Sequence, residues 1–284
     1  MNDPLAFLLP YEFSPIVLAA CLAAAAIYAR GLLRRRRRGL ADGWIRPLGY
    51  FLGVALMYGV LQTHYDYMSQ HMFFLHRLQH LVLHHLAPFL IMLSVPGPIL
   101  VAGVPGPVRR RLLRPLARSP AVRIPYRIVQ QPIVAATLFF GLIYLWLFPS
   151  LHVYAMLNVP LYDTMNWSMA IDGLFFWYLM LASPGPMRGG LHYGWRMLIL
   201  GAVIPPQIVV GAYIALSGKD LYTIYAVCGR LWPINAMTDQ VIGGLVTWIP
   251  AAMMSAIGAI VLLHRWMHEE NAALEPAQPK SAYA

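Results

Sequence analysis

Apolar runs, each about 20 residues long, recur along the whole sequence and limit what this chain can fold into. An α-helix of that length is what is needed to cross the hydrocarbon core of a bilayer. Only 11% of the residues are charged, against about 25% in a typical soluble domain. We therefore expect an integral membrane protein in which spans and short loops leave no room for a large soluble catalytic module.

The apolar runs predict an all-α fold, a polytopic bundle of seven transmembrane helices that forms a single domain over residues 1–268. Proline and glycine clusters such as "SPGPMRGG" separate the runs. The composition of residues 269–284 predicts a disordered tail. The predicted spans are about 14–33, 47–66, 71–94, 130–149, 167–183, 197–217 and 239–264.

Arginine is concentrated in the connections after the first, third and fifth predicted spans, including "RRRRR" at 34–38 and a series between 109 and 127. Positive charge in short loops marks the cytoplasmic side, so we expect the N-terminus outside and the C-terminus in the cytoplasm. This topology accounts for the formal net charge of +10. We expect the same arginines to attract membrane lipid with anionic headgroups. Nucleic acid is not an expected partner.

Six of the ten histidines lie in the run "HYDYMSQHMFFLHRLQHLVLHH" at 64–85. His76 and His80 are four residues apart, which puts them on one helix face with about 5–6 Å between their Cβ atoms. Two imidazoles at this spacing can share one metal ion, and the nearby thioether of Met72 suits Cu(I). The alternative is that these imidazoles form hydrogen bonds between helices and hold a bundle together.

Other potential ligands and proton-carrying groups lie on the predicted outer side or within a span. An ionisable group inside a span is a functional candidate by default. His84 and His85 stay open, since they could face a channel or hydrogen-bond a neighbouring helix. Further metal ligands are predicted at His64, His71, His152 and Asp239, and groups that hold a proton or orient a ligand at Asp66 and Asp172.

The run "HRLQHLVLHHLAPFLIMLSVPGP" at 76–98 resembles the HMxQHxxLxxxAPxLLxxGxP signature of the membrane-embedded CtaG family of cytochrome c oxidase assembly factors. "MTDQVIGGLVTWIP" at 237–250 is similar to the family's DQxxGGxxMW stretch, and "FFW" at 175–177 to the aromatic end of its fifth span. The resemblance covers most of the chain, including the number of spans. There are two departures: Arg77 stands where the family has methionine, and Asn166 stands near the second position of a histidine pair.

The resemblance implies a chaperone-like protein, not an enzyme, that helps mature a haem–copper oxidase of the respiratory chain in the bacterial inner (plasma) membrane. It implies roles for His76, His80, Asp239 and Gln240. Copper, as Cu(I) or Cu(II), would be bound on the outer side and delivered to catalytic subunit one of cytochrome c oxidase. Asp172 could then substitute for the missing histidine as an oxygen ligand. Other copper chaperones and a homo-oligomer stay open as partners.

Two other classes of function remain as alternatives. A haem-binding or redox membrane protein would need facing histidines, such as His76 or His80 with His152. A copper or proton transporter would use intramembrane Asp and His residues. A retinal pigment is excluded because the only lysines, Lys219 and Lys280, lie in a predicted loop and in the tail. The sequence also contains no acyl-transfer triad, P-loop or Rossmann fingerprint.

Overall fold

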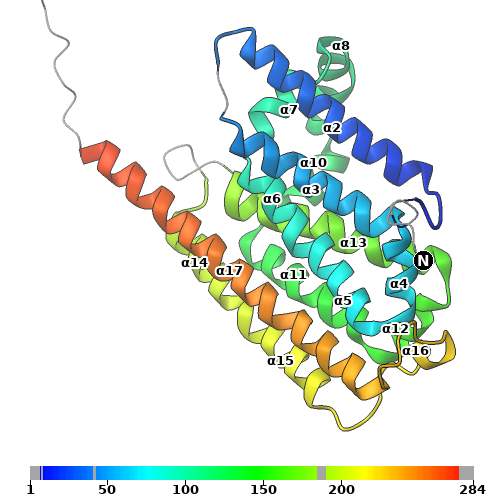
Figure 1. Cartoon of the computed structure of the whole chain (residues 1–284). Helices are drawn as coiled ribbons and strands as arrows, with labels where there is room; N and C mark the ends of the chain where they lie inside the picture. The colour runs from blue at the N-terminus through cyan, green and yellow to red at the C-terminus, as the bar shows by residue number, and fades with distance from the viewer. Residues whose placement is uncertain (1–6, 8, 41–42, 184–189, 275–284) are drawn as a thin grey trace, which may run out of the picture.

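The computed structural model describes residues 7, 9–40, 43–183 and 190–274, which fold into helices with short connections (Figure 1). Among these residues the one β pairing is an isolated bridge between Pro10 and Thr63, so the expected all-α fold is confirmed. The described helices of the first half are α2 (Pro15–Arg36), α3 (Ile45–Gln62), α4 (His64–His71), α5 (Phe73–Leu81), η1 (Val82–Leu86), α6 (Ala87–Leu93), α7 (Gly97–Gly103), α8 (Gly106–Val108), η2 (Arg109–Leu113), α9 (Arg114–Arg118) and α10 (Pro120–Val129). Those of the second half are α11 (Pro132–Leu147), α12 (Pro149–Met156), α13 (Val159–Trp177), η3 (Tyr178–Ala182), α14 (Tyr193–Ala202), α15 (Ile204–Leu216), α16 (Ile224–Val227) and α17 (Ala236–Leu274).

In the described chain, three helices are long and apolar enough to cross a bilayer, or five if each bent pair counts as one span. The sequence predicts seven. α3 and α13 occupy the second and fifth predicted spans and are helical, but their length and composition leave them outside this set. The three are Pro15–Arg36, Tyr193–Leu216 and Ala236–Ala272; the bent pairs are Phe73–Leu93 with Gly97–Gly103 (78°) and Pro120–Val129 with Pro132–Leu147 (76°).

The third predicted span, 71–94, is not one regular helix. The chain is extended at Met72, where α4 ends and α5 begins. Further along, α5 widens into the π-turn η1 just before Pro88. Proline lacks an N–H and its ring clashes with the carbonyl four residues earlier, here that of His84, so a wider turn relieves this position. The π-turn leaves His84 and His85 both buried, although they are consecutive.

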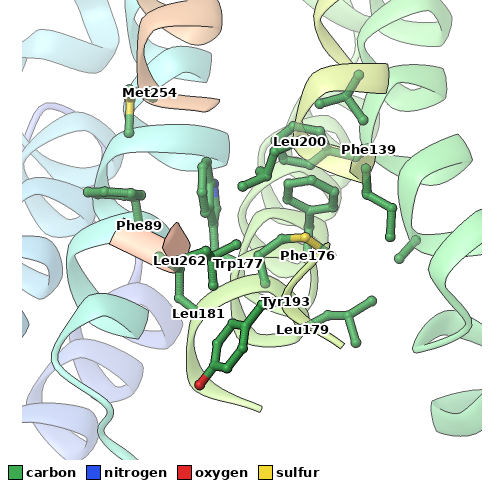
Figure 2. Close-up of a cluster of buried hydrophobic side chains, with 14 residues drawn as sticks. Phe89, Phe139, Phe176, Trp177, Leu179, Leu181, Tyr193, Leu200, Met254 and Leu262 are labelled. Atoms are coloured by element: carbon green, nitrogen blue, oxygen red, sulfur yellow. The ribbon is translucent and has the colours of Figure 1, made fainter. Parts of the chain in front are cut away.

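An aromatic cluster lies beyond the histidines, where α6, α11, α13, α14 and α17 meet (Figure 2). The rings of Phe139 and Phe176 stack at 3.7 Å between centroids, and Phe89 meets Trp177 edge-on at 4.9 Å. Phe139 also stacks on His84 at 4.2 Å. The apolar cluster therefore closes one end of the column of buried histidines along α5 and η1.

The last helix, α17, is the longest described element and runs beside α14, α15 and α5 (Figure 1). It continues to Leu274 and so includes the beginning of the segment 269–284, for which the sequence predicts a disordered tail. The rest of that predicted tail, 275–284, lies outside the described residues. The contact between α5 and α17 positions the start of the histidine column.

Candidate metal centre

The N-terminus of α5 is held by a carboxylate from the distant helix α17. Asp239 is fully buried, and its two oxygens accept hydrogen bonds from the backbone N–H groups of Phe73 (3.1 Å) and Phe74 (2.9 Å). The Nε atom of Arg230 lies 3.3 Å from Oδ2 of the same carboxylate. Because the first N–H groups of a helix lack partners within it, Asp239 acts as their cap and ties α5 to α17.

Three buried imidazoles meet next to this cap. The ring centroids of His76 and His80, both in α5, are 4.4 Å apart, and His152 of α12 approaches His76 at 5.1 Å. None of the three side chains is more than 1% exposed. The spacing of His76 and His80 does place their rings together, and the fold adds His152 from a distant part of the chain. We call His76, His80 and His152 the imidazole triad.

His152 is held in one tautomer. Its Nδ1 lies 3.0 Å from the carbonyl oxygen of Trp146, which can only accept, so Nδ1 carries the proton. The hydroxyl of Tyr225 then donates to Nε2 at 2.9 Å. These groups lie outside the candidate spans, and burial lowers the pKa of His152 to about 4 and raises the pKa of Tyr225 well above its ordinary value. The imidazole is neutral, with its lone pair on Nε2.

His80 is also fixed by two partners. A guanidinium N–H of Arg77 donates to Nδ1 at 3.2 Å, so Nε2 carries the proton and donates to Oδ1 of Asn166 at 3.2 Å. Arg77 is 3% exposed, and its Nε donates to the hydroxyl of Thr247. Since both of these partners are neutral, Arg77 places a buried positive charge directly beside the triad.

His76 differs from its two neighbours. It is fully buried, and neither of its ring nitrogens has a hydrogen-bond partner. Most buried polar groups in native proteins are hydrogen-bonded, and an unpaired one costs about 1–3 kcal/mol, so such an exception needs an explanation. A bound metal ion that accepts the lone pair of one ring nitrogen would explain why His76 is unpaired.

The triad suits copper by its donor chemistry but does not form a closed cage. Among the described residues no three His, Cys, Asp or Glu side chains are placed so that they could hold a metal ion. To bind one ion, the three rings would have to turn from these positions. The ion would then take a free nitrogen of His76, and His80 and His152 would each give up a hydrogen bond for it. The thioether of Met156 lies 4.0 Å from the Tyr225 hydroxyl, and imidazole with thioether is a donor set that copper accepts.

His64 and His71, two other predicted ligands near the start of the run, contact aromatic side chains outside the triad. His64 meets Tyr11 edge-on, with 6.0 Å between ring centroids. His71 packs on Tyr67 at 4.2 Å, and its Nδ1 donates to the carbonyl of the same residue. Met72 is fully buried at the break before α5. In the part of the chain that the structure describes, no ring contact joins either histidine to the triad.

Asp66 lies at the centre of a network that joins α4, α5 and α13. Its Oδ1 accepts hydrogen bonds from Gln79 and Tyr162, each at 2.7 Å, and its Oδ2 accepts one from Gln70 at 3.0 Å. The ring of Tyr162 lies 6.0 Å from that of His76. With three donors already bound, Asp66 positions the helices around the triad.

A cavity of about 300 Å³ opens beside this network. Its lining includes the carboxylates of Glu12, Asp66 and Asp163, together with Asn166. Because the amide oxygen of Asn166 accepts the hydrogen bond from His80, one residue separates the cavity from the triad. The negative lining of the cavity raises the local concentration of cations.

A second buried polar pair lies deeper along the same helix. The Nε2 atom of His84 is 2.9 Å from Oδ2 of Asp172, and both residues are buried. Gly173 lets α13 approach this closely, because a Cβ there would overlap the backbone of His84. His85 lies 4.9 Å from His84 between ring centroids. Asp172 therefore pairs with the π-turn and not with the triad.

Gln240, predicted to assist at the site, closes the connection between α15 and α16. Its Oε1 accepts a hydrogen bond from the N–H of Leu221, and its Nε2 donates to the carbonyls of Ile214 and Lys219. All three bonds fall between 2.8 and 3.1 Å. Its amide therefore fixes loop geometry one residue beyond the helix cap at Asp239.

Comparison with known families matches residues 26–269, a stretch that includes the whole triad, to the cytochrome c oxidase caa3 assembly factor family (Caa3_CtaG). The chain belongs to this family. Two curated mycobacterial relatives of this assembly-factor chain, uncharacterized proteins of Mycobacterium bovis and Mycobacterium tuberculosis, are each 26% identical over 145 residues. The match covers 46% of this chain and 22% of each relative, so the chain spans about a fifth of their length. No solved structure matches.

The two positions at which this family member departs from the signature both contact one residue. Arg77 and Asn166 hydrogen-bond the two ring nitrogens of His80. Sequence comparison marks them as unusual, but only the fold shows that they act on the same imidazole. Tyr225 and Tyr162 were missed by sequence reasoning, because neither stands in a motif or at a periodic spacing from the histidines.

Proposed function

We propose that this chain assists the assembly of a caa3-type cytochrome c oxidase by taking up copper as cargo at the imidazole triad and passing it to the oxidase catalytic subunit. Membership of the assembly-factor family supports the process. One observation carries the copper step: His76 is fully buried with both ring nitrogens unpaired, and its ring lies 4.4 Å from that of His80 and 5.1 Å from that of His152.

The incomplete donor set favours transfer over storage. In this structure His80 and His152 each make two hydrogen bonds, so each can exchange one for copper and restore it when the metal leaves. A closed cage of charged ligands would hold the ion too tightly to pass it on. Asp239 is not proposed as a ligand, because both of its oxygens already bind the N-terminus of α5.

The acidic cavity provides access for the cation. Glu12, Asp66 and Asp163 line it, and Asn166 links it to His80. The proposal retains seven spans in the bacterial inner membrane, with the N-terminus outside and the C-terminus in the cytoplasm. In that topology the cavity and the triad lie near the outer face, and the arginine-rich connections lie inside.

The geometry does not favour a haem held between histidines of the triad. Two axial imidazoles must stand on opposite sides of a porphyrin ring. His76 and His152 instead meet edge-to-face at 5.1 Å between centroids, which leaves no room for a macrocycle between them. Copper, and not haem, therefore remains the proposed ligand.

Metal analysis and an absorption spectrum on the same detergent-purified sample test the proposal. We expect about one Cu(I) per chain and no Soret band, with copper lost in the His76→Ala/His80→Ala double variant. The matched control is His64→Ala/His71→Ala, which removes the same number of imidazoles away from the triad and should retain copper. Full copper loading in the triad variant would refute the assignment, and a Soret band would favour the haem alternative.

A further inference from the structure

A basic groove lies between the C-terminal turn of α2 and the segment from α7 to η2. Four arginines line it, Arg34, Arg35, Arg38 and Arg109, around a cavity of about 300 Å³. No Asp or Glu belongs to the described lining. Guanidinium groups keep their charge at any physiological pH, so the groove presents fixed positive charge to an anion. The groove is defined by these four residues, and it has no part in the imidazole triad.

Close packing of α2 and α7 builds the groove. At Gly103 a Cβ would overlap the backbone of Ile27, so the two helices approach to backbone contact there. Arg34 donates to the carbonyl of Ala102 at 3.0 Å, one of the carbonyls at the end of α7 that lack partners within the helix. This bond gives Arg34 a structural role. Arg109 also donates, from its terminal N–H, to the carbonyl of Val101 at 3.5 Å, but its Nε atom is buried without a partner.

The rest of the lining is apolar and includes Leu40, Val101 and Val104. A charged end next to an apolar wall is the pattern of a headgroup and its acyl chains. Trp44, which follows α2 in the chain, is 74% exposed, as expected of an aromatic side chain at a membrane surface. The groove therefore combines the two chemistries that meet at the boundary of a bilayer.

Helix α10, which follows the groove residues in the chain, also indicates that this region lies at the membrane surface. α10 is bent by 76° from α11, so α10 lies close to the membrane plane if α11 crosses it. Its exposed side chains include Arg123 and Arg127 as well as Ile124 and Ile128. A helix with basic and apolar side chains that lies in this plane is typical of the headgroup region.

We propose that the basic groove binds the phosphate group of an anionic phospholipid, with its acyl chains against the apolar lining. A bound phosphate would accept charge-assisted hydrogen bonds from the groove and give Arg109 Nε an acceptor. Basic pockets between helices on the cytoplasmic side suit such headgroups. This inference is independent of the copper proposal.

Native mass spectrometry of the full chain tests the site with three probes: phosphatidylglycerol, phosphatidylcholine and inorganic phosphate. The wild-type chain should retain phosphatidylglycerol in preference to phosphatidylcholine. Arg38→Gln/Arg109→Gln should lower that preference about tenfold. The control Arg37→Gln/Arg110→Gln removes the same charge from exposed residues outside the groove and should change it less than about twofold. Arg38→Lys/Arg109→Lys, which keeps the charge, should retain most of the preference and shows that loss of fold is not the cause.

Three results would overturn the proposal. If the groove variant and its control lost the lipid preference equally, the preference would depend on general surface charge and not on the groove. Equal retention of both lipids would mean that the headgroup is not recognised. Retention of inorganic phosphate without any lipid preference would assign the groove to a free anion.

Discussion

The Nε2 atom of His84 lies 2.9 Å from Oδ2 of Asp172, which links the π-turn to the C-terminal half of α13. Both side chains are buried, and Gly173 allows the two helices to approach at this point. Removing one partner of a buried polar pair leaves the other unpaired and costs more than the bond itself contributes. We therefore expect the pair to stabilise the contact between η1 and α13.

Replacing Asp172 tests this role. Asp172→Leu should lower the free energy of unfolding by about 1–3 kcal/mol, because it leaves the buried imidazole of His84 without its acceptor. Asp172→Asn keeps an acceptor oxygen and should cost less. Thermal unfolding in detergent measures both. Asp163→Leu removes an exposed carboxylate from the same helix and should have little effect. Equal losses from Asp172→Leu and Asp163→Leu would contradict a specific pair.

The helical class and the shared face of His76 and His80 could be predicted, because hydropathy and the helical repeat depend on nearby residues. The family could also be recognised from residues 76–98. The break at Met72 and the π-turn before Pro88 could not, since a regular repeat assumes an unbroken helix.

Contacts between distant segments could not be predicted from the sequence either. Asp239 was predicted as a metal ligand, but it caps a helix that lies more than 160 residues earlier in the chain. The spacing of residues on one helix cannot reveal such a partner. Likewise, Tyr225 reaches His152 from a short helix whose own sequence carries no ligand pattern.

Tyr225→Phe should tighten copper binding. The variant removes the hydroxyl that donates to Nε2 of His152, so the metal no longer competes with that bond. A net hydrogen bond contributes about 1 kcal/mol, which corresponds to roughly fivefold in affinity. Competition with a chromogenic Cu(I) chelator measures the change. Tyr222→Phe is the matched control, because its hydroxyl donates to the carbonyl of Leu147 and not to a histidine. Unchanged or weaker binding in Tyr225→Phe would remove His152 from the ligand set.

Arg77→Met should also tighten copper binding, by about tenfold or more, because it removes a buried positive charge beside His80 and frees its Nδ1. Methionine also introduces a thioether donor. Arg77→Lys keeps the charge and should bind copper no more tightly than the wild type. The same chelator competition distinguishes the two. Equal affinities for Arg77→Met and Arg77→Lys would show that charge at this position does not control the site.

Substitution of Asp239 distinguishes its role as a helix cap from a role as a metal ligand. Asp239→Ala removes the acceptor for the N–H groups of Phe73 and Phe74, so we expect a loss of about 1–2 kcal/mol in the free energy of unfolding. Asp239→Asn keeps one acceptor oxygen and should recover part of that loss. Copper bound per folded chain should stay unchanged in both, because no ligand has been removed. If copper were lost in both variants while the unfolding temperature stayed at the wild-type value, Asp239 would be a ligand after all and the triad would need a fourth donor.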